Sequence, residues 1–478
     1  MDRRPDLTSL SHHEKDALIR ALWAQVQALT TQVQLLTARV TTVQGRVTQL
    51  EAELGVPPKT PGNSSLPPSA GQRPNRDDRP ARTGPRRGSL GRKGGGRLLA
   101  EAPDETVTAR PARCAHCQAA LGEADQTLAA RFDKVDLPKV APVVTRVERY
   151  AGHCRCCGAT TLAPPPEGLE PGTPFSPNIV AVAMCLRFAH HVSYRRLSRL
   201  LRDLYGPVIS EGALDAAFRR TKPRFDAETA ASFAFGPVVR TLARLRRARV
   251  VCSDETATRI GGQSCWNWVF QNAEVVIHVV RRSRGAGVVA EVMGGHRPAL
   301  WVSDLYSARR GHAAAWQICL AHRLRDCRFA TEAGDAVFAP RLNALLPRAV
   351  ALARRHQGLT ESTRRQYRRR LEQALDAVMA LAPTNRHGQR LRRRHGRLRE
   401  HLFTVLDHPE VTADNKGSER ELRPTATYRK VTGGFRSDWG ADLFAAVRSV
   451  IGTAARRGID AYHAIRAILQ GQSALAPG

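Results

Sequence analysis

The chain has 478 residues, of which 42% are hydrophobic, so it is long enough for two or three domains and at least one sizeable core. Its 74 Lys and Arg against 43 Asp and Glu give a formal net charge of +31, which makes nucleic acid the expected partner. No signal segment begins the sequence and no stretch approaches the roughly 18 apolar residues that span a bilayer, so we expect a cytoplasmic, nucleoid-associated protein without a membrane partner.

A heptad pattern occupies the first part of the chain. Apolar residues recur in steps of four and three from Leu22 to Leu54, with Val at the a positions and mostly Leu at the d positions. This combination favours a parallel two-stranded coiled coil. We predict a coiled coil over residues 1–56 and a homodimer or higher self-assembly; the alternative is a helix that packs its stripe on its own chain. The a and d residues include Val26, Val33, Val40, Val47, Leu22, Leu29, Leu36 and Leu50.

Residues 57–105 are rich in Pro, Gly, Ser and Arg and poor in large apolar side chains, which predicts a flexible basic linker. Two Cys-x-x-Cys pairs follow within residues 106–165, namely Cys114 with Cys117 and Cys154 with Cys157. Such turns bring two sulfurs to one tetrahedral zinc, so we predict a small domain with a structural Zn²⁺. The alternatives are a redox pair or unliganded thiols. Rival ligands within the segment are Cys156, His116 and His153.

Residues 166–245 change to a helical pattern. A turn at Gly206 and Pro207 precedes a segment for which Ser210 is a plausible N-cap. Helix, glycine-containing turn and helix are compatible with a helix-turn-helix DNA-binding domain. Three ordinary core helices are an equally good interpretation, because the motif has no diagnostic residue.

Strand periodicity begins after Arg249. Three predicted strands, separated by short turns, form a meander, followed by a short helix and the apolar run ALWVS. We assign residues 246–325 to the first part of an α/β domain, residues 326–404 to an Arg-rich helical insertion, and residues 405–478 to its second part with C-terminal helices.

Two acids follow apolar runs in this region, Asp254 in VVCSDE and Asp304 in LWVSD. We expect both at strand ends, where carboxylates can hold two Mg²⁺ ions for phosphoryl transfer. A turn or helix cap is the simpler interpretation of either Asp alone. A third acid, Glu419 or Glu421, lies in DNKGSERELRP on a predicted short helix, and periodicity alone does not choose between them.

At these residues the sequence resembles the insertion-sequence 66 family of transposases. The resemblance covers nearly the whole chain, through NSSLPPS, SDET, WVSD, CLAH, DNKGSERELRP, YRK and SVIGTAARRG. It implies a ribonuclease-H-like catalytic domain with a helical insertion and a triad of two Asp and one Glu. The family's element normally opens Asn-Asn and carries Ala before the Glu, whereas this chain has Asp414 and Ser418. The triad that the resemblance implies is Asp254, Asp304 and Glu419.

The interpretation is therefore a DNA transposase that cleaves and joins the ends of an insertion sequence with catalytic Mg²⁺ or Mn²⁺. Double-stranded DNA, both element ends and target, and accessory proteins of the element are the expected partners. Cys319 and His322 match a family C-x-x-H and are ranked as site modifiers. The rival is a non-catalytic zinc and coiled-coil DNA-binding regulator or accessory protein. Candidates for contact with the DNA backbone are Arg420, Arg423, Arg429 and Lys430.

Overall fold

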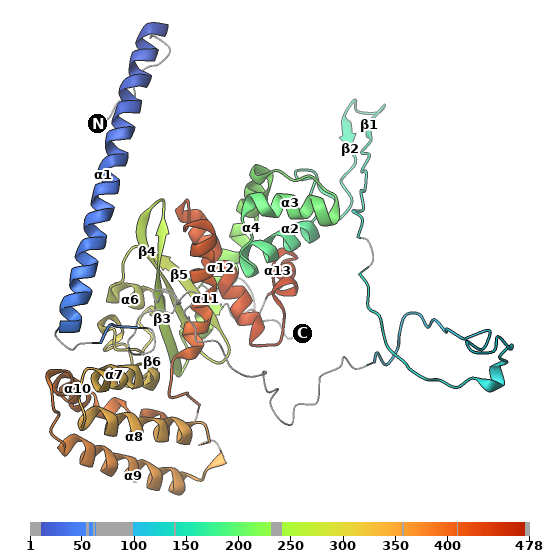
Figure 1. The fold of residues 1–478 in the computed structure, drawn as a ribbon. Helices are drawn as coiled ribbons and strands as arrows, with labels where there is room; N and C mark the ends of the chain where they lie inside the picture. The colour runs from blue at the N-terminus through green and yellow to red at the C-terminus, as the bar shows by residue number, and fades with distance from the viewer. Residues whose placement is uncertain are drawn as a thin grey trace. The chain divides into compact units, whose positions relative to one another are not determined.

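A computed structural model describes residues 11–53, 57–60, 63, 99–137, 140–230, 241–355, 358–408 and 410–473. The predicted linker at 57–105 lies for the most part outside these residues. The chain forms two units, one made of residues 73–166 and 200–208 and the other of the remaining residues. Figure 1 shows the larger unit as a sheet with helices on it.

The helix α1 (His12–Glu53) is continuous over 42 residues. The apolar side chains of the heptad pattern are 46% to 61% exposed in the single chain. The expected helix is therefore present, and its pairing with a second chain stays a prediction. The exposed heptad residues are Leu22, Val26, Leu29, Val33, Leu36, Val40, Val43 and Val47.

A five-stranded mixed sheet forms the centre of the larger unit, in the order β5-β4-β3-β6-β7. The first three strands are antiparallel to their neighbours, as the meander predicted, while β6 and β7 run parallel to β3. The strand β7 was not predicted, because four residues are too few to show a period of two. The strands are β3 (Val250–Ile260), β4 (Gln263–Gln271), β5 (Val276–Arg281), β6 (Leu300–Ser303) and β7 (Ala315–Ile318).

The two faces of the sheet carry different helices. Trp268 and Phe270 of β4 pack with α6 (Ala286–Met293) on one face. Val269, which alternates with them, packs against Leu422 of α11 (Lys416–Thr432) on the other face. Successive side chains of a strand point to opposite faces, so both faces of β4 are buried.

Four α-helices make up most of the predicted insertion. Their apolar side chains pack with Leu300 and Val302 of β6 into one core, so the insertion is anchored directly beside the strand that precedes Asp304. The helices are α7 (Leu320–Glu332), α8 (Phe338–Ala353), α9 (Glu361–Ala380) and α10 (Arg386–Arg397).

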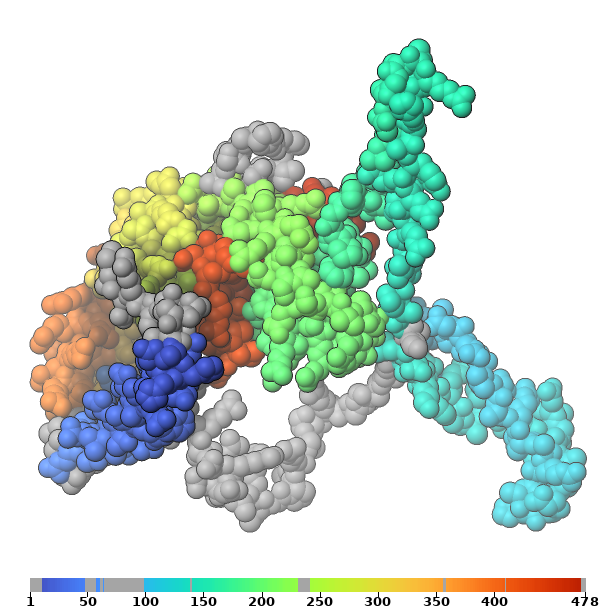
Figure 2. Space-filling model, turned by 90° about the horizontal axis from the view of Figure 1, so that it is seen from above, coloured from blue at the N-terminus to red at the C-terminus, as the bar shows by residue number. Residues whose placement is uncertain are grey.

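Residues 166–245, the region predicted to be helical before the sheet, contain several helices in the structure. Ser210 caps α4 (Glu211–Thr229), since its hydroxyl accepts a hydrogen bond from the Ala213 N–H at 3.2 Å. This helix packs against α12 (Asp438–Ala455), which in turn covers β5. In Figure 2 the orange-red C-terminal helices accordingly lie between the yellow strands and the green helices. The other α-helices within residues 166–245 are α2 (Pro177–Met184), α3 (Tyr194–Tyr205) and α5 (Thr241–Leu245), and α13 (Ala461–Leu469) follows α12 near the C-terminus.

Among the helices that the structure describes, none is both long and apolar enough to cross a membrane.

Candidate functional site

The two candidate Asp residues lie where the parallel pairing of β3 and β6 ends. Cys252 is paired with Val302, and each candidate follows two residues later, Asp254 within β3 and Asp304 just after β6. We expected Asp254 to end its strand, but β3 continues to Ile260 because its antiparallel pairing with β4 does. Asp304 follows its strand as expected.

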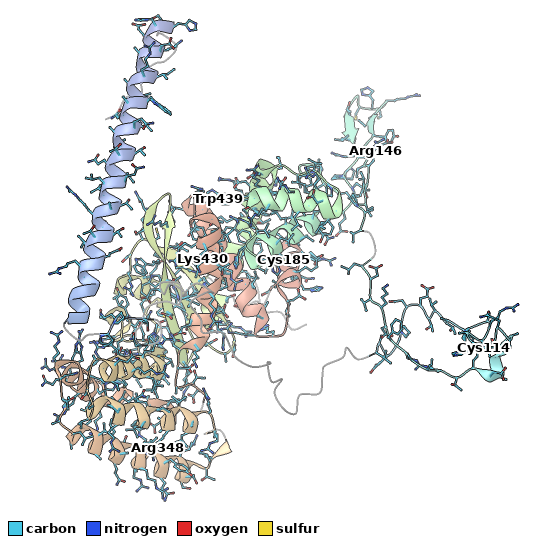
Figure 3. The ribbon with its side chains drawn as sticks, viewed as in Figure 1. Cys114, Arg146, Cys185, Arg348, Lys430 and Trp439 are labelled. Carbon is cyan, nitrogen blue, oxygen red and sulfur yellow. The ribbon has the colours of Figure 1, made fainter. Side chains whose placement is uncertain are left out.

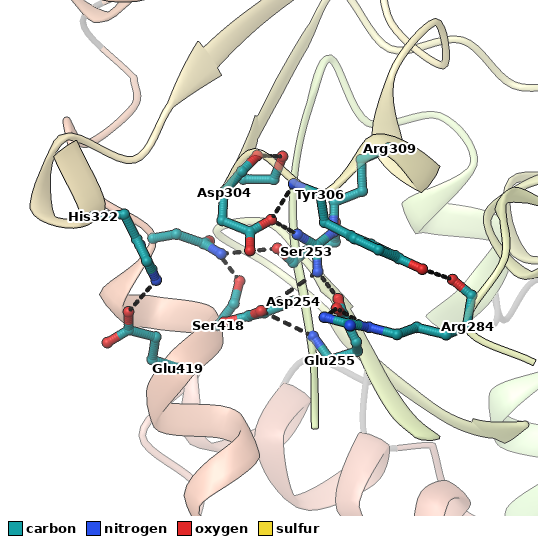
Figure 4. Close-up of polar contacts among 12 residues, drawn as sticks. Ser253, Asp254, Glu255, Arg284, Asp304, Tyr306, Arg309, His322, Ser418 and Glu419 are labelled. Carbon is teal, nitrogen blue, oxygen red and sulfur yellow. Dashed lines mark hydrogen bonds and ion pairs between the residues drawn. The ribbon is translucent and has the colours of Figure 1, made fainter. Parts of the chain in front are cut away.

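A buried cation joins these acids. The guanidinium of Arg309 donates to the Asp304 carboxylate and lies 3.4 Å from Oδ1 of Asp254 (Figure 4). It also pairs with the buried Glu255, the residue after Asp254. Arg309 is only 1% exposed. Sequence reasoning missed Arg309 and Glu255, because nothing in SARRG distinguishes this arginine from the many on the surface.

The charges of the site shift the pKa of the acids. Burial raises the pKa of Asp254 to about 7; the negative charges of Asp304 and Glu419 add to this rise, while Arg309 opposes it. Burial also raises the pKa of Asp304, against a hydrogen bond of 2.9 Å that its Oδ1 accepts from the Tyr306 N–H. The pKa of Asp254 therefore depends on the charges of the other two candidate acids as well as on burial.

The structure separates Glu419 from Glu421, which the sequence left open. Glu419 lies in the first turn of α11, with its Oε1 3.9 Å from Nε2 of His322. Glu421 lies among residues of another group: its carboxylate is 3.1 Å from the Arg456 guanidinium and 3.9 Å from both Arg448 and the His278 imidazole. Residues two apart on a helix point in widely different directions.

A chain of buried hydrogen bonds fixes the start of α11 to the strand that carries Asp254. The Asn415 amide donates to the backbone oxygen of Ser253 at 2.8 Å and accepts from the Ser418 hydroxyl at 2.8 Å. That hydroxyl accepts in turn from Gln271 of β4 at 2.9 Å. Ser418 thus completes a network that fixes the start of α11, whose first turn carries Glu419, to the strand that carries Asp254.

Cys319 and His322 have separate surroundings. Cys319 is buried, its sulfur accepts a hydrogen bond from the Asn415 N–H at 3.2 Å, and burial raises the pKa of its thiol to about 11. It therefore supports α11 as a neutral thiol. Burial lowers the pKa of His322 to about 4, so a neutral imidazole faces Glu419.

The oxygen-donor chemistry of the site suits Mg²⁺ or Mn²⁺, and the Arg309 guanidinium already stands between two of the carboxylates as a cation would. Yet among the described residues no three His, Cys, Asp or Glu side chains are grouped so that they could hold an ion. The chemistry of the donors suits a divalent metal, but the described residues hold Asp254 and Asp304 around the guanidinium of Arg309 and do not group three donors as a metal site.

The candidate DNA-contacting residues line α11. Arg420, Arg423 and Lys430 are exposed, and Figure 3 labels Lys430 on this helix. Arg429 is half-buried and donates to the backbone oxygen of Ala257 in β3, so part of its role is to join α11 to the sheet.

The two Cys-x-x-Cys segments form matching turns. The Cys114 N–H donates to the Ala119 oxygen at 2.9 Å, and the Cys154 N–H donates to the Ala159 oxygen at 2.8 Å. Hydrogen bonds from the following backbone N–H groups, those of Cys117 first, lower the pKa of the Cys114 thiol, and Cys157 does the same for Cys154. The turn at Cys154 lies between the short strands β1 (Ala151–His153) and β2 (Thr160–Leu162). Figure 3 labels Cys114 in its turn. Within the described residues these pairs are not assembled into one group.

Comparison with known proteins gives one family. Residues 172–443 match the sequence model of the family described as transposase IS66 family. The matched segment includes the sheet, the helical insertion and all three candidate acids. No curated protein matches the chain.

Proposed function

The chain belongs to the IS66 family of transposases, and we propose that it cuts and joins DNA with Asp254, Asp304 and Glu419 as its catalytic carboxylates. The observation that carries this proposal is that Asp254 and Asp304 contact one buried guanidinium, that of Arg309. The charge of Glu419 supports it, since it adds to the rise in the pKa of Asp254. The sheet order, with three antiparallel strands beside two parallel ones, supports a ribonuclease-H-like catalytic domain.

Divalent ions held by the three carboxylates would supply activation of the nucleophile and stabilisation of the leaving oxygen. The chain's own residues prepare that site. The Asn415 network holds the start of α11, which carries Glu419, against β3, and Arg309 balances the charges of Asp254 and Asp304. Water would attack the phosphodiester at the element's end and release a 3′-hydroxyl. That hydroxyl would then attack a phosphodiester of the target and displace the 3′-oxygen of the target strand.

We extend the proposal to two supporting parts. The paired cysteine turns hold a structural Zn²⁺ through Cys114, Cys117, Cys154 and Cys157, because each turn already has the hydrogen bonds that stabilise thiolates. The exposed heptad face of α1 pairs with the same face of a second chain. Both the zinc domain and the dimer would help to hold double-stranded DNA, the expected partner.

The test is Mg²⁺- or Mn²⁺-dependent nicking and strand transfer on DNA that carries the element's ends. Asp254→Asn, Asp304→Asn and Glu419→Gln should each reduce the rate by several orders of magnitude while DNA affinity is kept. Asp438→Asn removes an exposed carboxylate that pairs with Arg282 at 3.1 Å and serves as the control. Activity retained in the three variants would refute the site and favour the non-catalytic DNA-binding class.

A further inference from the structure

A cavity of about 580 Å³ opens beside the candidate catalytic acids. Asp304 and His322 line it, and so does the face of α10 that belongs to the helical insertion. Six arginines and two carboxylates contribute to its wall. The cavity is therefore strongly basic at a point that the proposed active site also reaches.

One helix supplies most of this charge. Of its four arginines at this cavity, the second, third and fourth lie three, four and seven residues after the first, which places them on one face. Arg394 is paired with Asp326 at 2.9 Å, whereas the other three are exposed to solvent. From the first to the last the row extends about 10 Å along the helix axis, which is longer than a single phosphate group. The four are Arg390, Arg393, Arg394 and Arg397.

A buried arginine lies in the wall behind this row. Arg323 is 3% exposed, and its guanidinium is 2.8 Å from the Asp326 carboxylate. Within the part of the chain that the structure describes, its buried Nε has no hydrogen-bond partner. A buried charged donor without an acceptor is unfavourable, and the positive charge of Arg323 adds to that of the exposed arginines in the cavity wall, so the cavity favours an anionic ligand.

We propose that this cavity binds successive backbone phosphates of the DNA strand next to the bond that is cut. Arginine forms bidentate contacts with phosphate oxygens, and a row of arginines suits an extended polyanion better than a lone ion. The helical insertion thereby becomes the part of the protein that holds the strand against Asp304. This inference rests on the proposed function, since it takes Asp304 to be catalytic.

Binding measured in EDTA tests the cavity without any cleavage. We would compare a DNA duplex bound by wild type and by the triple variant Arg390→Gln, Arg393→Gln and Arg397→Gln, from low to moderate salt. Each lost phosphate contact should reduce the slope of log affinity against log salt by about 0.9, so a decrease of about 2–3 is expected. A slope and affinity equal to those of wild type would overturn the proposal.

Two matched variants separate the cavity from general charge. Arg341→Gln, Arg348→Gln and Arg369→Gln remove the same charge from exposed positions of α8 and α9 outside the cavity wall, where Figure 3 labels Arg348. Their slope should change by less than about one unit. The triple variant Arg390→Lys, Arg393→Lys and Arg397→Lys should keep most of the wild-type slope, because lysine keeps the positive charge. Equal losses in both Gln triples would reject a special role for the cavity.

The position of the bound strand is tested with neutral methylphosphonates placed singly along a duplex that carries the element's end. Wild type should lose affinity when the neutral group adjoins the scissile bond, and the α10 triple variant should lose much less. Equal losses in both proteins would overturn the placement. If these binding tests fail, the proposed function still stands. If cleavage survives Asp254→Asn, the proposed function is refuted, and the results of the binding tests are unaffected.

Discussion

The buried guanidinium of Arg309 donates a hydrogen bond to the carboxylate of Asp304 and comes within 3.4 Å of Asp254. In this state one arginine balances two acids that would otherwise repel one another, with Glu255 as a further counter-ion. A divalent cation at the same acids would compete with it.

We expect Arg309→Gln to bind Mn²⁺ at least about tenfold more tightly than wild type, because the competing charge is gone, which corresponds to about 1.4 kcal/mol. The metal-free variant should unfold more easily, by about 3–5 kcal/mol, since it leaves buried carboxylates unpaired. Calorimetric titration and thermal unfolding measure the two effects. Arg310→Gln, at the exposed neighbouring position, is the control. Weaker Mn²⁺ binding in Arg309→Gln would show that this arginine supports the metal site.

Glu421 should make stability depend on pH. Burial alone would raise its pKa, but the neighbouring His278 and the Arg456 guanidinium lower it to about 2 from 4.5. A depressed pKa stabilises the fold above the unfolded value, and this contribution is lost as pH falls from about 4.5 toward 2. Glu421→Gln should therefore lower the free energy of unfolding by about 3 kcal/mol at pH 7 and by little near pH 2. Urea unfolding of wild type and Glu421→Gln at both pH values measures this effect. A difference in the free energy of unfolding that does not change with pH would contradict the ion-pair explanation.

Ser418 should contribute to stability through its buried hydroxyl. Its hydroxyl is buried between Gln271 and Asn415. Ser418→Ala leaves both partners without this contact and should lower the free energy of unfolding by about 1–3 kcal/mol. Ser362→Ala on exposed α9 should have almost no effect. Stability equal to wild type in both would mean that water replaces the hydroxyl.

Zinc content should depend on Cys157 and not on Cys156. The side chain of Cys157 contributes to lowering the pKa of the Cys154 thiol, as that of Cys117 does at Cys114. Elemental analysis should find about one zinc per chain in wild type and in Cys156→Ser, and much less in Cys157→Ser. If Cys157→Ser kept its zinc and Cys156→Ser lost it, Cys156 and not Cys157 would be the zinc ligand.

Self-association should depend on the a positions of α1. Asp at Val33 and Val40 would place charges at the interface between the paired helices, so the double variant should be monomeric by light scattering. Thr31→Asp with Ala38→Asp changes two f positions, which face away from the interface, and should leave the dimer intact. A wild-type monomer would refute the coiled coil.

Local patterns predicted a good part of this protein. The meander of β3 to β5 follows from strand periodicity, the helical insertion from Leu and Arg spacing, and the position of Asp304 from the apolar run before it. The four-residue strand β7 was missed, and β3 was predicted too short at Asp254, because the length of a strand depends on the partner with which it pairs.

The sequence by itself determined most of the helical and extended segments, the positions of the acids and cysteines that follow them, and the strongly basic charge of the chain. Only the tertiary structure decided that Glu419 lies by His322 whereas Glu421 pairs with Arg456. It also decided that Arg309 is buried between the Asp residues and that the arginines of α10 line the cavity beside Asp304. The physical reason is that periodicity indicates which face of a single helix or strand is buried. It carries no information about which distant element packs against that face, and the chemistry of the site depends on those long-range contacts.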